Sequence, residues 1–282
     1  MPVNDVLLVL TPYPDPTPET AVSGAVAIAA ELGARVAAIA CEAKIRVPGN
    51  PFGNILIDLP AIAAAEAKKS ADSAAHLLKV FSEEARKRGV AAETIHERSY
   101  SMDAPGVLAE YARFRDLTIL PVPEAEALEQ WYAETIIFES GRPTLIVPFE
   151  WKKRPAFKLE TVVVAWDFSK TAARAVADSI PLLQKAKKTL IVTVTNEKEI
   201  DTARSANELA RHLAHHGIEV TVESVSAAGR PIGTTLKTFC SDHDADLLVM
   251  GAYGHSRFRE FVLGGATSSL LSQPTLPVLM SH

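Results

Sequence analysis

The stretch Met250-Gly251-Ala252-Tyr253-Gly254, followed after nine residues by Gly264-Gly265-Ala266-Thr267, decides the fold. It continues an apolar run that follows Asp246 and ends at Met250, and this run predicts a buried strand. A glycine has no Cβ, so its N–H can approach a ligand oxygen closely. A helix that begins at Gly264 would add unpaired N–H groups and a partial positive charge. Together these features predict a backbone cradle for phosphate, with a spacing unlike that of the P-loop or the dinucleotide fingerprint.

Strand and helix patterns alternate along the whole chain, and the series occurs twice. Short joints between them predict right-handed crossovers and parallel sheets. In the first series we expect strands at 5–11, 34–41, 90–98, 117–122 and 144–148, and helices at 17–32, 61–88, 105–114 and 128–139. Thr17 is the expected N-cap of the first helix, with Pro18 at its first position. In the second we expect strands at 161–167, 189–195, 218–225, 246–250 and 276–280, and helices at 170–183, 201–216, 232–243 and 264–272. The helix at 61–88 can be an amphipathic layer helix or a partner-binding helix.

An internal repeat supports a duplicated α/β domain. Arg115–Leu120 aligns with Ala245–Met250, and Pro143–Val147 with Pro274–Val278, at an offset near 130 residues. A charged, proline-containing segment at 150–160 separates the two series. We therefore predict a first domain at 1–149, a linker at 150–160 and a second domain at 161–282.

The glycine spacing resembles that of the universal stress protein family, and the chain resembles a tandem member. This resemblance implies two doubly wound domains, each with a five-stranded parallel sheet in the order 3-2-1-4-5. It also implies a site for ATP or a related adenine nucleotide, with Mg²⁺ on the phosphates, in the second domain. The sequence departs from the family where Gly265, rather than Ser or Thr, follows Gly264, and the hydroxyl returns at Thr267.

The resemblance also implies residues beside the adenosine. Asp167 and Ser169 match the family's Asp-x-Ser turn, and Val194 matches its adenine-contacting position. From the residues alone, Asp167 and Ser169 indicate a helix N-cap, which is compatible with the binding role. The expected nucleotide-binding set is Asp167, Ser169, Val194, Met250, Gly251, Gly254, His255, Ser256, Gly264, Gly265, Ala266 and Thr267.

The first half lacks the cradle. Pro121 and Glu124 stand where the second half has Gly251 and Gly254, and Thr11 begins the turn where the second half has its aspartate. Proline removes an N–H, and a carboxylate repels phosphate. We therefore expect the first domain to be degenerate, with its nucleotide site lost.

The composition of the chain narrows the classes of function that remain. The net charge is −5, and the charges are interspersed, so no nucleic-acid footprint is indicated. The two cysteines, one in each half, fit a reducing cytoplasm better than a disulfide framework. No apolar run has the length of a membrane span. His212, His215 and His216 have helical spacing, but we expect no metal site there and no catalytic residue.

We expect an ATP-binding regulatory protein of the stress response. The alternatives are a slow ATPase or phosphotransferase and a nucleotide-free interaction module with an unknown protein partner. The resemblance further implies internal pairing of the two domains through their fifth strands. A homodimer is also possible.

Overall fold

The structure is a computed structural model that describes residues 2–45, 58–124, 127–150, 157–195, 202–252 and 265–282. Its strands join into one ten-stranded sheet in the order β3-β2-β1-β4-β5-β10-β9-β6-β7-β8. Each half contributes five strands in the order 3-2-1-4-5, and within each half neighbouring strands are parallel. The predicted fold class is therefore confirmed.

In the described part of the first half there are nine elements, each close to its predicted position. In order these are β1 (Asp5–Leu10), α1 (Glu19–Leu32), β2 (Arg35–Lys44), α2 (Leu59–Arg88), β3 (Ala92–Tyr100), α3 (Ala104–Arg113), β4 (Leu117–Val122), α4 (Ala127–Glu139) and β5 (Thr144–Pro148). The central strands are buried on both faces, as expected for a parallel sheet covered by helices.

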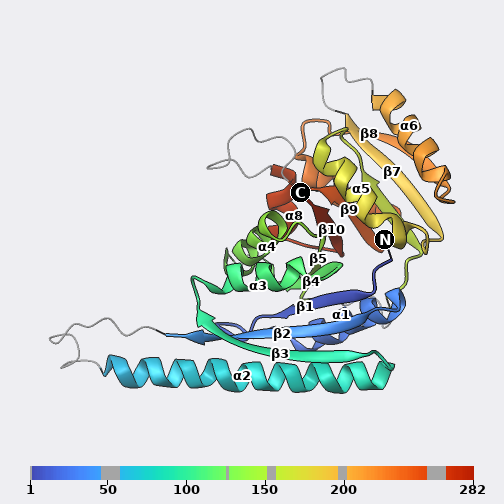
Figure 1. Ribbon diagram of the computed structural model, residues 1–282. Coiled ribbons are helices and arrows are strands. Elements are labelled where there is room, and N and C mark those ends of the chain that lie inside the picture. The colour runs from blue at the N-terminus through green and yellow to red at the C-terminus, as the bar shows by residue number, and fades with distance from the viewer. Residues whose placement is uncertain (1, 46–57, 125–126, 151–156, 196–201, 253–264) are drawn as a thin grey trace.

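The second half repeats this series. Its elements are β6 (Thr161–Ala165), α5 (Lys170–Leu183), β7 (Lys188–Thr195), α6 (Thr202–Ala214), β8 (Val220–Ser226), α7 (Ile232–Asp242), β9 (Leu247–Gly251), α8 (Gly265–Ser272) and β10 (Val278–Ser281). One apolar core lies between the sheet and helices α1, α2, α5 and α6. A second core lies on the opposite face, under α3, α4, α7 and α8 (Figure 1).

The two halves join through their last strands. β10 pairs antiparallel with β5, with Val278 opposite Ile146 and Met280 opposite Thr144. The predicted pairing through the fifth strands is therefore present within the chain. Pro277 precedes β10, so its missing N–H costs no ladder hydrogen bond, and its carbonyl accepts the N–H of Leu248.

A pair of aspartates shows the internal repeat at the level of hydrogen bonds. One carboxylate oxygen of Asp116 accepts the N–H groups of Asn4 and Asp5 at 2.9 and 3.0 Å. In the second half, one oxygen of Asp246 accepts those of Glu160 and Thr161 at 3.0 and 2.9 Å. Each aspartate thus fixes the first strand of its half against the fourth.

Two local predictions are wrong. Thr17 does not cap α1, because its hydroxyl accepts the N–H of Thr11 at 2.9 Å and so closes the β1–α1 loop. The aligned prolines also differ from the prediction. Pro143 corresponds to Pro277 rather than Pro274, since the carbonyl of Pro143 accepts the N–H of Thr118 as that of Pro277 accepts Leu248.

Helix α2 runs along β3 at one end of the sheet (Figure 1). Its buried residues begin at Ser70 and continue at helical spacing to Ala85. This part of α2 is a layer helix, which agrees with the first of the two readings of the sequence. Among the described residues, none belongs to a helix with both the length and the apolar character of a membrane span.

Replacing Asp246 by Ala should lower the stability of the second half. The side chain is 4% exposed. Its loss would leave two N–H groups without their carboxylate, at a cost of about 2–4 kcal/mol in the free energy of unfolding. The midpoint of urea unfolding measures this loss. Asp246→Asn, which keeps one acceptor oxygen, should lose less. Equal midpoints for wild type and Asp246→Ala would contradict the proposed role.

Candidate functional site

The candidate site lies at the carboxyl ends of β6 and β9, which are neighbours in the sheet although α5, α6 and α7 separate them in the chain. The crossover from β6 leads to β7 on one side, whereas β9 pairs with β6 on the other. The strand order therefore reverses at this point, and in open α/β sheets the crevice at such a reversal is where ligands bind.

The turn after β6 is held by its own side chains. Ser169 is the N-cap of α5, with its Oγ accepting the N–H of Ala172 at 3.1 Å. The N–H of Ser169 in turn donates to Oδ1 of Asp167 at 3.0 Å. The N-cap predicted from the residues is thus present. The Asp167 side chain is nevertheless exposed, at the edge of the crevice. Its fixed position is compatible with a ligand contact.

Phe168, between these two residues, has a φ of 62° and lies 68% exposed. The left-handed region is uncommon for a residue with a side chain. Its ring meets that of the buried Trp166 edge to face, with the centroids 6.1 Å apart. The turn therefore presents one large aromatic side chain to solvent, which the sequence analysis did not single out.

Gly251, the last residue of β9, is a glycine for a reason that the sequence did not reveal. A Cβ built there would lie 2.4 Å from the backbone nitrogen of Ala172 and 2.5 Å from the carbonyl carbon of Thr171. The first turn of α5 therefore packs directly on the backbone of β9. This close contact accounts for Gly251 independently of any ligand.

Gly265, the first residue of α8, has the opposite environment. It is exposed, and no heavy atom of the described residues lies within 4 Å of a Cβ built on it. Ala266 is half-buried, and Thr267 is only 2% exposed. The Thr267 side chain is therefore enclosed by the protein in this structure. The solvent-facing start of the helix therefore presents backbone at Gly265 rather than the hydroxyl that the sequence suggested.

Apolar residues line the strand ends beside this helix. Met250 on β9, Ala165 on β6 and Val194 on β7 all contact the core under α7 and α8, so they project from the same face of the sheet. Val194 is half-buried near the end of its strand. The structure thus brings Asp167, Ser169, Val194 and Met250 to one edge of the sheet with Gly251 and Gly265–Thr267. Gly254, His255, Ser256 and Gly264 lie outside the described residues, and their roles stay predictions.

The corresponding region of the first half is filled by side chains. Strand registers align Cys41 with Val194, and the buried pattern of α4 aligns Tyr132 with Ala266. Tyr132 is 6% exposed and Glu129, one turn earlier, 3%. Burial raises the pKa of the Tyr132 phenol, and the nearby Cys41 and Glu129 raise it further. The first half therefore has a buried phenol where the second half has the half-buried methyl group of Ala266.

Neither cysteine is prepared for nucleophilic chemistry. Burial raises the pKa of Cys41 to about 11 and that of Cys240 to about 12. Because the thiolate is the reactive form, both thiols are protonated and unreactive at neutral pH.

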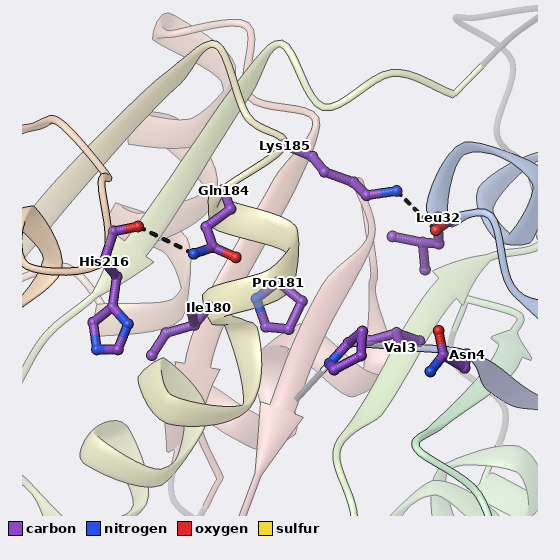
Figure 2. Close-up of a pocket in the computed structure, with 9 residues that line it drawn as sticks. Val3, Asn4, Leu32, Ile180, Pro181, Gln184, Lys185 and His216 are labelled. Carbon is purple, nitrogen blue, oxygen red and sulfur yellow. Dashed lines mark hydrogen bonds between the residues drawn. The ribbon is translucent and has the colours of Figure 1, made fainter.

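A cavity of about 570 Å³ lies elsewhere, at the seam between the halves (Figure 2). The long polar side chains that line the cavity already make hydrogen bonds within the protein. Nζ of Lys185 donates to the carbonyls of Glu31 and Leu32 at the end of α1, at 3.1 and 2.7 Å. Nε2 of Gln184 donates to the carbonyl of His216 at 3.0 Å. Because these contacts tie the ends of α1, α5 and α6 together, we interpret the cavity as part of the packing between the halves.

His212 of α6 contacts His216, which lies just beyond the end of that helix. The rings of His212 and His216 meet edge to face with centroids 4.9 Å apart. Within the part of the chain that the structure describes, no three His, Cys, Asp or Glu side chains come together as a metal site would require.

Comparisons with known proteins match the second half in sequence and both halves in fold. The model of the universal stress protein family matches residues 158–282. The universal stress protein Slr1230 of Synechocystis sp. is 50% identical over 38 residues, which cover 14% of this chain and 13% of that protein.

Two solved structures resemble the entire chain. A universal stress protein from Archaeoglobus fulgidus DSM 4304 has a TM-score of 0.73 and 17% identity, covering 98% of this chain and 95% of its own. A putative universal stress protein from Pseudomonas aeruginosa UCBPP-PA14 has a TM-score of 0.57 and 15% identity, covering 99% and 93%. At these identities the likeness establishes the fold alone.

The contrast between the two glycines gives a stability prediction. Gly251→Ala should destabilise the protein by at least about 2 kcal/mol, because its Cβ meets backbone atoms that cannot rotate away. Gly265→Ala should leave stability equal or slightly higher, since the methyl group enters open space and alanine favours helix. Thermal unfolding of both variants without added ligand measures the difference. Equal losses at the two positions would contradict the packing described here.

Proposed function

We propose that the second half, whose residues 158–282 match the model of the universal stress protein family, binds an adenine nucleotide at the carboxyl ends of β6 and β9. The nucleotide, ATP with Mg²⁺ on its phosphates or a related adenylate, would act as a regulatory ligand. The protein would accordingly work by binding and by a change in its interactions rather than by rapid turnover.

The observation that carries the proposal is the open start of α8. Gly265 places exposed backbone at the N-terminus of an eight-residue helix, beside the end of β9. N–H groups in a first helical turn have no partner within the helix, and the helix dipole adds partial positive charge there. Phosphate is the group that such a terminus binds best.

The other residues of the candidate site suit the ribose and the base of the nucleotide. Asp167 presents an exposed carboxylate at the end of β6, and a carboxylate at this edge of an α/β sheet can accept hydrogen bonds from ribose hydroxyls. Val194 and Met250 offer apolar surface on neighbouring strands, which suits a flat base. Since Ser169 fixes the Asp167 turn, this part of the site requires little rearrangement on binding.

We propose one nucleotide for each chain. In the first half, Tyr132 is buried at the position that aligns with Ala266, and Thr11 is used in the loop contact with Thr17. Pro121 also replaces Gly251 and has no N–H to offer. These features support a role for the first half other than nucleotide binding.

Gly265→Asp separates binding from folding. The side chain would enter open space, and an acidic residue in a first helical turn favours the helix, so the protein should fold normally. The carboxylate would repel phosphate, so the affinity for Mg-ATP should fall at least about tenfold. Calorimetric titration of nucleotide-stripped protein with Mg-ATP measures both the affinity and the stoichiometry.

Two controls isolate the charge and its position. Gly265→Asn has nearly the same shape without the charge and should bind more tightly than Gly265→Asp. Gly106→Asp places the same charge in the first turn of α3, where a Cβ also meets open space, and should bind as wild type. If folded wild-type protein does not bind Mg-ATP, ADP or AMP, the proposal is wrong, and an interaction module without nucleotide becomes the better account.

A further inference from the structure

We propose that the first half positions the nucleotide site of the second half through a three-residue relay, in which Phe138 supports His282 and His282 holds Ala252. The proposal rests on the proposed function. It gives the first half a specific task, which is to fix the end of β9 where the chain leaves the sheet next to the site.

The relay ends at Ala252, which follows Gly251 and is fully buried. Both of its backbone groups are held by the segment at the end of β10. Its N–H donates to the carbonyl of Ser281 at 2.8 Å. Its carbonyl accepts a hydrogen bond from Nδ1 of His282 at 3.1 Å, and since a carbonyl only accepts, Nδ1 carries the proton. The position of Ala252 therefore depends on where the His282 ring lies.

The His282 ring is supported from the other half of the molecule. Phe138 of α4 meets it edge to face, with the ring centroids 4.6 Å apart and the planes at 72°. This is a preferred arrangement for aromatic rings. Phe138 itself is 39% exposed, so its ring is only partly committed to the core of its own half. The contact with His282 crosses from the first half to the second.

The same helix also contacts the second half directly. α4 packs against α8, whose start at Gly265 forms the proposed phosphate cradle. Helix α4 therefore contacts the second half at two places, at α8 directly and at Ala252 through His282. A shift of α4 would therefore be transmitted both to α8 and, through His282, to Ala252.

The relay predicts effects on affinity that exceed its effects on stability. Phe138→Ala and His282→Ala should each weaken Mg-ATP binding by about three- to tenfold, as expected for loss of one aromatic contact or one hydrogen bond that orders the site. The melting temperature without ligand should change little, because both side chains lie partly in solvent. Since the two residues act in series, the double variant should bind about as weakly as the single variants.

Conservative variants distinguish positioning from general packing. Asn at 282 can place an amide N–H where Nδ1 donates, so His282→Asn should restore most of the affinity lost in His282→Ala. Phe138→Tyr keeps the ring and should bind nearly as wild type. Phe114→Ala, which removes a 75% exposed ring from the same half, is the matched control and should have no effect.

Amide hydrogen exchange on the ligand-free protein tests the relay independently of nucleotide. Exchange at the end of β9, measured on a peptide that contains Ala252, should accelerate in Phe138→Ala and His282→Ala and not in Phe114→Ala. Wild-type affinity and unchanged exchange in both variants would overturn the relay while leaving the proposed function intact. If the wild type does not bind nucleotide, the proposed function fails instead, and the exchange data alone decide whether Phe138 fixes Ala252.

Discussion

The antiparallel contact between β5 and β10 is the constraint on which the rest of the structure depends. Within each half all neighbouring strands are parallel, so each half has a carboxyl edge that can hold a ligand. Because β10 runs opposite to β5, the carboxyl edge of the second half lies beside the start of β5, where Met280 pairs with Thr144. The end of α4, just before β5, is thereby brought to the second-half site, and the contact between Phe138 and His282 follows from this geometry.

Much of the fold could be predicted because local and global signals agree. Continuous Val and Leu runs mark strands that are buried on both faces, and glycines mark helix ends such as Gly33 and Gly89, which adopt positive φ. The repeat around Asp116 and Asp246 proved to reflect equivalent hydrogen bonds. The errors arose where one residue type has two uses. Thr17 before a proline resembles an N-cap, but its hydroxyl closes a loop, and two prolines near the last strand made the alignment ambiguous.

The site was predictable only in part. Its location follows from the strand order and the glycine spacing, and the Ser169 cap could be recognised from its neighbours. The reason for Gly251 could not, because the first turn of α5 that packs on it is about 80 residues away in the sequence. The burial of Thr267, which is 2% exposed, could not be read from the glycine spacing, and its role toward a ligand stays a prediction. Residues from the other half, Phe138 and Tyr132, carry no local signal at all, since their importance arises from tertiary contacts.

The fusion of both halves in one chain also has a thermodynamic consequence. Two separate subunits joined by one short strand pair would dissociate on dilution, and a ligand site that depended on their contact would lose affinity with them. Here the partner is tethered, so its effective concentration is set by the chain, on the order of millimolar for a short connection, and is independent of how much protein is present. Such a molecule can respond to the concentration of its ligand without also responding to its own abundance.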